Sequence, residues 1–190
     1  CIRDSYGGGV YSPEGTPSFI VNNIVVDSNK AIVSGGGFYS NASSSFKVYD
    51  SIFRNNEAAS TQTGGDGIGG GGVYIESSSS SPSPVQNVSL SNLTFEGNSA
   101  VNGRGGAFYR SGNVTVTVWN SLLTSNSALK GGGFYLGAGS SSMRLTRLVS
   151  NKGTSNGGGL MIEGMEMLTV RNCTLQSNDC LLYTSDAADE

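Results

Sequence analysis

The residues that could do acid–base chemistry here are carboxylates, because the 190-residue chain contains no histidine. A glycosidase needs two carboxyl groups close together, and a polysaccharide lyase needs acidic calcium ligands beside a basic proton acceptor. Glu163 and Glu166 stand near each other in one segment only, which favours a solvated turn. Asp50 stands where most equivalent segments have asparagine, which favours a structural role. We therefore expect no catalytic residue and predict that the chain is not an enzyme.

Cofactor and metal chemistry are not predicted either. Residues 64–68 resemble one calcium-binding nonapeptide, but that motif works by repetition, because each turn completes the ligands of the next. A net charge of −3 with 11 lysines and arginines argues against a nucleic-acid partner. The sequence has no apolar run long enough for a membrane span. We expect no cofactor, no metal, no nucleic acid and no membrane span in this segment.

Tyrosines recur in a pattern that could contact a ligand. A triplet of small residues followed by two apolar or aromatic residues occurs at 7–11, 35–39, 70–74, 105–109, 131–135 and 157–161. Rings that face outward would form a flat platform for sugar rings or a partner surface, whereas rings that face inward would be core. The partner expected for such a platform is a polysaccharide or a host or neighbouring cell surface. The candidate contact stripe is Tyr39, Tyr74, Tyr109 and Tyr135, with Tyr11 before it.

The tyrosine blocks belong to an internal repeat of about 27 residues. Six asparagines each close one segment, at spacings of 27, 42, 28, 25 and 27 residues, and the segments align without gaps. The 42-residue spacing carries two Gly/Ser/Pro-rich insertions, at 57–69 and 76–86, which are predicted to be surface loops. The six asparagines are Asn29, Asn56, Asn98, Asn126, Asn151 and Asn178.

Apolar residues alternate with period two before each of these asparagines, most clearly at Val114, Val116 and Val118. This pattern predicts strands, and no stretch has helical periodicity. Short strands cannot bury an apolar face alone, but stacked repeats can. The predicted fold is all-β: a right-handed parallel β-helix, or solenoid, of about six coils of about 27 residues, truncated at both ends.

Stacking also explains the asparagines. Each side-chain amide can bond the one above and the one below, so the six residues are predicted to form a structural Asn ladder that satisfies buried polar groups. A second column lies six residues earlier and includes Asn23, Asn92 and Asn172. Asparagine tolerates the left-handed conformation of a sharp corner, so this column is predicted to be a second ladder or a second corner.

Two segments are expected, with one boundary between residues 179 and 180. Residues 1–179 are predicted to be the β-helix fragment. Residues 180–190 read CLLYTSDAADE, which resembles the translation of a sequencing adapter, so we expect this tail not to belong to the fold. The tail holds three acids and no base, and the acidity of the chain therefore carries no implication for partners.

The two recurring blocks resemble the repeat of the polymorphic outer membrane proteins, whose signature is Gly-Gly-Ala-apolar together with Phe-x-x-Asn. Residues 105–108 fit the first part, 53–56 and 95–98 fit the second, and 123–126, 148–151 and 175–178 fit with leucine for phenylalanine. More broadly, the sequence is similar to pectin-lyase-like β-helices. The resemblance implies an extracellular or cell-surface spacer or adhesin passenger, with signal and anchor outside the fragment. The alternative is a polysaccharide-binding or polysaccharide-degrading β-helix whose active coils lie outside it.

Overall fold

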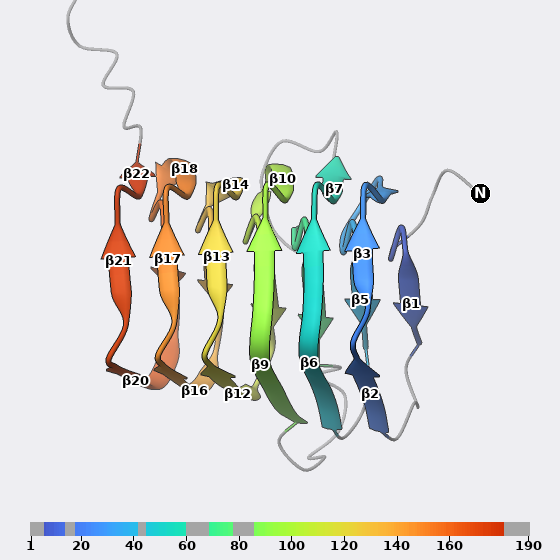
Figure 1. Cartoon of the computed structure of the whole chain (residues 1–190), viewed down its shortest axis with the longest axis horizontal. Coiled ribbons are helices and arrows are strands. Elements are labelled where there is room, and N and C mark those ends of the chain that lie inside the picture. Colours follow the sequence, from blue (N-terminus) through green and yellow to red (C-terminus); the bar gives the residue numbers. More distant parts are fainter. Residues whose placement is uncertain (1–5, 14–17, 42–44, 60–68, 78–85, 181–190) are drawn as a thin grey trace, which may run out of the picture.

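A computed structural model of the chain describes residues 6–13, 18–41, 45–59, 69–77 and 86–180. In this part of the chain all regular structure is β-strand, and the strands pair in parallel into three sheets. Figure 1 shows the sheets as stacks of strands that run across one long axis. No helix among the described residues is long and apolar enough to cross a membrane.

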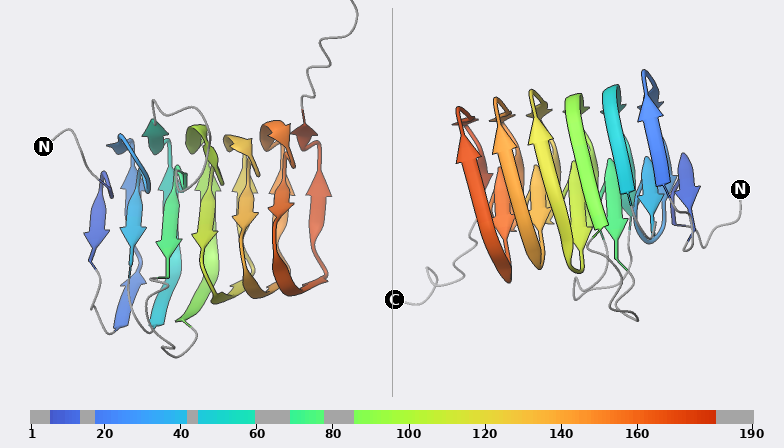
Figure 2. Two further views of the ribbon diagram at one scale, coloured as in Figure 1. Left: turned by 180° about the vertical axis from the view of Figure 1, so that it is seen from behind. Right: turned by 90° about the horizontal axis from the view of Figure 1, so that it is seen from below.

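Sheet I has six strands and forms the back of the molecule in Figure 1 and the front of the left view in Figure 2. Its strands are β1 (Val10–Ser12), β5 (Phe38–Ser40), β8 (Val73–Glu76), β11 (Phe108–Ser111), β15 (Phe134–Leu136) and β19 (Leu160–Ile162). Sheet III also has six strands and forms the upper edge in Figure 1. Its strands are β4 (Lys30–Ala31), β7 (Glu57–Ala59), β10 (Ser99–Arg104), β14 (Ser127–Lys130), β18 (Lys152–Asn156) and β22 (Asp179–Cys180).

Sheet II has ten strands and two arms that meet at a corner in every coil. The lower arm comprises β2 (Ser18–Asn22), β12 (Val114–Trp119), β16 (Gly139–Arg144), β20 (Met165–Arg171) and the first halves of β6 (Ser45–Arg54) and β9 (Gln86–Glu96). The upper arm comprises β3 (Val25–Asp27), β13 (Leu122–Thr124), β17 (Arg147–Val149), β21 (Thr174–Gln176) and the second halves of β6 and β9. In Figure 1 the front strands run upward, the back strands run downward, and successive coils advance away from the N-terminus, which is a right-handed path.

The corners of each coil are residues with left-handed backbone conformation, with φ between 46° and 67°. Asparagine, aspartate and glycine adopt this conformation at low cost, which is why they recur there. The sequence pointed to only one of the two non-glycine corner columns, because the other is mostly serine. The columns are Asn23, Asp50, Asn92, Asn120, Leu145 and Asn172; Ser28, Asn55, Gly97, Ser125, Ser150 and Ser177; and Gly7, Gly35, Gly70, Gly105, Gly131 and Gly157.

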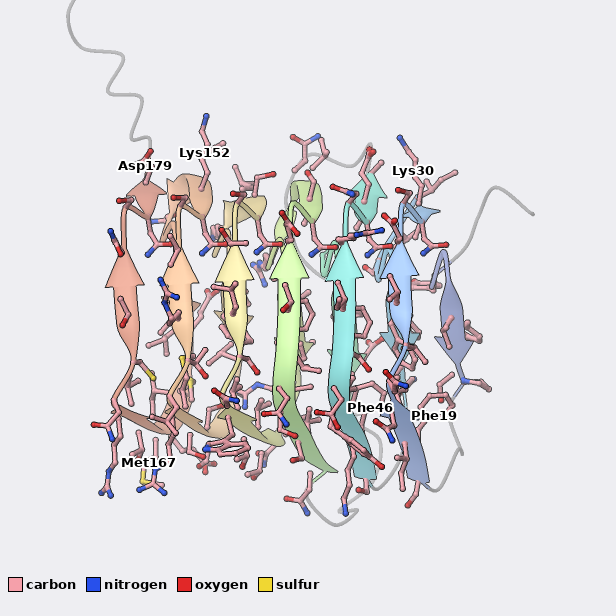
Figure 3. The ribbon with its side chains drawn as sticks, in the orientation of Figure 1. Phe19, Lys30, Phe46, Lys152, Met167 and Asp179 are labelled. Carbon is pink, nitrogen blue, oxygen red and sulfur yellow. The ribbon has the colours of Figure 1, made fainter. Side chains whose placement is uncertain are left out.

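The interior between the three sheets is a continuous apolar core. Phe53 and Phe95 are fully buried and stack in neighbouring coils with ring centroids 5.1 Å apart. Phe19 and Phe46 stack in the same way at 6.1 Å and lie side by side in Figure 3. Burying one such side chain contributes roughly 1.5–3 kcal/mol. Like residues therefore stack on like, and this periodic core holds the coils in register.

The glycine triplet has a steric cause. A Cβ at Gly132 would lie 2.4 Å from the carbonyl oxygen of Lys152 and 2.5 Å from that of Gly158. Both distances are far below van der Waals contact, so only glycine lets the backbones of sheet III and sheet I approach this closely. The triplet therefore marks the place where the chain passes from one sheet to the next.

The predicted all-β parallel solenoid is confirmed, with about five turns in place of six. Six asparagine segments enclose five complete repeats, so the sequence pattern counted one coil too many. Cys180 in β22 pairs with Gly153 in β18, so the last described strand extends one residue beyond the predicted boundary at 179. Residues 181–190 lie outside the described residues, as do 64–68 and most of both predicted insertions.

Candidate functional site

The interior of the solenoid contains a ladder of asparagine side chains, and one rung shows its geometry. The backbone N–H and the Nδ2 of Asn98 both donate to Oδ1 of Asn126, each at 2.9 Å. The Nδ2 of Asn126 then donates to Oδ1 of Asn151 at 2.9 Å and to the backbone oxygen of Phe95 at 3.1 Å. Each amide therefore binds the coils on both sides of it through its own donors and acceptor.

The same bonding continues over the whole described stack. Asn29 donates to Asn56, Asn56 to Asn98, and Asn151 to Asn178, all at 2.9–3.1 Å. The four central asparagines are completely buried, and the two end members are partly buried. A buried amide without partners costs about 1–3 kcal/mol, so the ladder fixes which coil lies on which. The members are the six asparagines whose spacing predicted it: Asn29, Asn56, Asn98, Asn126, Asn151 and Asn178.

The earlier asparagine column is an exposed corner with a shorter ladder. Asn120 donates to Asn92, and Asn92 donates to Oδ1 of Asp50, each at 2.9 Å. Asp50 has a φ of 50° at this corner, as its place in the column indicated. Leu145 interrupts the column with a φ of 52° and no amide to offer. The second column therefore shapes the turn but leaves its side chains in solvent.

A third polar column was missed by sequence reasoning. Buried hydroxyls directly after the exposed corner donate to the backbone oxygen two residues earlier, as Ser121 does to Trp119 at 3.0 Å and Thr146 to Arg144 at 3.0 Å. The Ser121 Oγ also accepts from the backbone N–H of Leu93 in the preceding coil, at 3.2 Å. The sequence signal was a serine or threonine five residues before the ladder asparagine in three of the six segments.

The tyrosine column forms a second, separate core cluster. Tyr39, Tyr74, Tyr109 and Tyr135 are between 1% and 5% exposed, and Met161 packs against them. The sequence left open whether these rings face outward or inward; the structure buries them, so they do not present an exposed ligand platform. The glycine turns lie against these rings, since a Cβ on Gly70 would meet the Cβ of Tyr74 at 2.7 Å. Both faces of the four central strands of sheet I, β5, β8, β11 and β15, are therefore buried, whereas Tyr11 on the end strand β1 is 53% exposed.

The tyrosine cluster is electrostatically unusual. The hydroxyl of Tyr39 donates to Oε2 of Glu76 at 2.5 Å. Burial, together with the nearby Glu76 carboxylate, raises the pKa values of Tyr39 and Tyr74 far above the ordinary value for tyrosine. The guanidinium of Arg104 lies over the Tyr135 ring, 4.9 Å from its centroid. Burial and the Glu76 carboxylate favour the neutral phenols of Tyr39 and Tyr74, so neither hydroxyl is prepared to act as a base.

Arg110 is a buried cation that the sequence analysis did not single out. Its side chain is completely buried in the core. Nη1 donates to the backbone oxygen of Val114 and to Oγ of Ser141, and Nη2 donates to the backbone oxygen of Gly137. Burial lowers the pKa of Arg110 to about 10. Its partners are neutral oxygens, and through them the guanidinium joins the start of β12, the residue that follows β15, and β16.

The carboxylates are dispersed over the surface. Glu163 and Glu166 are both exposed, and the described residues contain no cluster of three or more potential metal ligands. Two ion pairs join neighbouring coils, Lys30 with Glu57 at 2.8 Å and Arg54 with Asp27 at 2.9 Å. The pKa of Asp27 is lowered, first by a hydrogen bond from Ser28. Such exposed pairs add little stability. Figure 3 shows Lys30, Lys152 and Asp179 projecting from the sheet III edge.

The fold and the repeated interior define the class of protein: a parallel β-solenoid built from stacked repeats. Within it, residues 92–109 match the Chlamydia polymorphic membrane protein repeat. This segment contains 95–98 and 105–108, two of the blocks that carried the resemblance, and the resemblance to this repeat is confirmed. No curated protein and no solved structure matches the chain. The repeat and the fold together suggest a structural role at a cell surface.

Proposed function

We propose that this chain is a non-catalytic structural segment of a secreted or surface-displayed protein, either a rigid spacer or an adhesin passenger. The observation that carries the proposal is the unbroken ladder from Asn29 to Asn178. In each coil, the side-chain amide of one asparagine forms hydrogen bonds that hold the next coil in place. Such an interior favours a stiff rod over a site that must open and close. The match to a surface-protein repeat gives independent support.

A display experiment tests the spacer role. The full chain is placed between a yeast cell-wall anchor and a distal epitope. In the control, a flexible Gly/Ser linker of equal residue number replaces it and carries 11 interspersed lysines and arginines, as many as the chain contains, so that trypsin can cut both. The proposal predicts that the rigid solenoid holds the distal epitope far enough from the cell wall for a bulky antibody conjugate to bind it. It also predicts that trypsin cuts the linker and leaves the solenoid intact. Cleavage of the solenoid at the rate of the linker would contradict a rigid spacer.

The alternative function is that of a polysaccharide-degrading β-helix whose active coils lie elsewhere. The broad resemblance of the repeat pattern to pectin-lyase-like β-helices favours it, while the scattered carboxylates argue against a site in this chain. Incubating the full chain with polygalacturonate, alginate and xylan, and then measuring new reducing ends and unsaturated uronates, separates the two. We expect no product from any polymer. If product forms, and Asp50→Asn or Glu166→Gln abolishes it, the chain is an enzyme and the proposal of a non-catalytic spacer is wrong.

A further inference from the structure

The outer face of the lower arm of sheet II carries a row of exposed or partly exposed polar and aromatic side chains, four of which are large. One residue from each coil contributes, and strand register places each beside the next. Adjacent members are therefore one strand spacing, about 4.8 Å, apart along the solenoid axis. We call this the axial row; its members are Asn22, Tyr49, Ser91, Trp119, Arg144 and Arg171.

The aromatic members of the axial row suit a sugar ring. Trp119 is the only tryptophan of the chain, and 45% of its surface is exposed. Tyr49 is partly exposed and lies two strands away, at about 9.6 Å, with the small Ser91 between them. An indole on the surface of a repeat otherwise rich in serine and glycine offers an apolar plane with a polar edge. The two rings are spaced to contact alternate residues of an extended sugar chain.

The charged members of the axial row suit an anion. Arg144 and Arg171 are exposed and directly opposite each other in the sheet. Like charges in this arrangement repel, and among the described residues neither arginine forms an ion pair. A carboxylate or sulfate placed between them would remove the repulsion and accept paired hydrogen bonds from planar guanidinium groups.

A second row on the same face supplies hydroxyls. It lies two residues earlier in each strand and consists of Ile20, Lys47, Ser89, Thr117, Ser142 and Thr169. The two rows together contain three bases and no acid. Two acids lie elsewhere on the lower arm or at its corner: Asp50, which accepts a hydrogen bond from Asn92, and the exposed Glu166, five residues before Arg171 in β20. Four consecutive strands each contribute one hydroxyl, from Ser89, Thr117, Ser142 and Thr169, and these can bond successive sugar hydroxyls.

From this combination we infer that the axial row binds an acidic polysaccharide, with the sugar chain parallel to the solenoid axis. Trp119 stacks on a sugar ring, Arg144 and Arg171 bind the acidic groups, and the hydroxyl row bonds the sugar hydroxyls. Three bases are few for a nucleic acid, whose binding depends on many phosphate contacts. The inference rests on the proposed adhesive role and names its partner class. It also moves the predicted contact from the buried tyrosine column to a different sheet.

Binding of the full chain to defined polymers tests this inference. Polygalacturonate and alginate are the acidic probes, dextran is the neutral probe, and single-stranded poly(dT) and anionic phosphatidylserine vesicles represent the other anionic partners. We expect the acidic polysaccharides to bind at least about tenfold more tightly than dextran, poly(dT) or the vesicles, with affinity that falls as salt rises. Equal binding of dextran, or tighter binding of poly(dT) or vesicles, would overturn the assignment.

Surface variants then locate the site. Trp119→Ala and the double variant Arg144→Ser with Arg171→Ser should each weaken polygalacturonate binding by about tenfold or more. The matched control is Arg147→Ser, which removes an exposed arginine from the upper arm three residues beyond Arg144. We expect it to change affinity less than about twofold. If the control weakens binding as much as the axial-row variants, general charge attraction explains the binding and the axial row is not its site.

The outcome is separable from that of the proposed function. All replaced side chains point into solvent, so the far-UV circular dichroism spectrum and the urea midpoint of each variant should match those of the parent chain. Loss of polymer binding with an intact display result would leave the spacer role standing. Absence of binding by the parent chain to either acidic polysaccharide refutes the axial row as a binding site, whatever the display result.

Discussion

Replacing Asn126 by alanine is the sharpest test of how the solenoid is held together. The substitution removes the acceptor for two donors of Asn98 and the donor to both the backbone oxygen of Phe95 and Oδ1 of Asn151, so four hydrogen bonds are lost. All of these groups are buried. At about 1–1.5 kcal/mol for each of these bonds, the free energy of unfolding should fall by about 4–6 kcal/mol. That is a large share of the stability of an ordinary domain.

The assay is equilibrium urea denaturation followed by far-UV circular dichroism, with Asn120→Ala as the matched control. Asn120 stacks in the same way, but its side chain is exposed, and its loss removes one donated bond to Asn92. It also places alanine at a φ of 46°, so we expect a loss of about 1 kcal/mol. Equal losses for the two variants, or less than about 1 kcal/mol for Asn126→Ala, would refute a stabilising buried ladder.

Three further variants test other parts of the account. Leu145→Asn should raise the free energy of unfolding by about 1 kcal/mol, because asparagine tolerates the left-handed corner; a lower urea midpoint would contradict this. Gly132→Ala should lower it by about 2–3 kcal/mol through contact with the Lys152 oxygen, and an unchanged melting temperature would count against close backbone stacking. Tyr74→Phe should weaken the alkaline loss of stability. Because burial raises the pKa of Tyr74, the neutral phenol contributes its full stability below pH ~10, and the free energy of unfolding falls above that pH by up to about 1.4 kcal/mol per pH unit. Identical slopes of unfolding free energy against pH for parent and variant above pH ~10 would contradict burial of Tyr74.

The fold could be predicted because its physics is periodic. Each ladder asparagine lies in an environment that recurs in every repeat. A single asparagine could have many roles, but six aligned ones indicate a stacked, buried position. The alternation at Val114, Val116 and Val118 similarly reports a strand with one buried face. The coil count was one too high because segments were counted in place of the intervals between them.

The surface chemistry could not be predicted in the same way. Phe38 and Tyr39 are both buried because the glycine turn lies over the outer face of sheet I, and period-two reasoning assigns one of any two neighbours to solvent. The role of Arg110 could not be predicted either, since most of its partners are backbone oxygens, which any residue type supplies, and Ser141 is 31 residues away in the sequence. Trp119 and Arg144 are neighbours in the sheet, but this cannot be inferred from the sequence until the register between their two strands is known.

Residue-resolved hydrogen exchange of the backbone amides of Asn56, Asn98 and Asn126 tests the stacked ladder most directly. Each of these N–H groups donates to the side-chain oxygen of the asparagine one coil further on, at 2.9–3.1 Å. The account predicts that all three exchange only when the whole solenoid unfolds, with the free energy that urea denaturation gives, and that Asn126→Ala selectively accelerates exchange at Asn98. Exchange of all three at the rate of exposed loop amides would contradict the ladder.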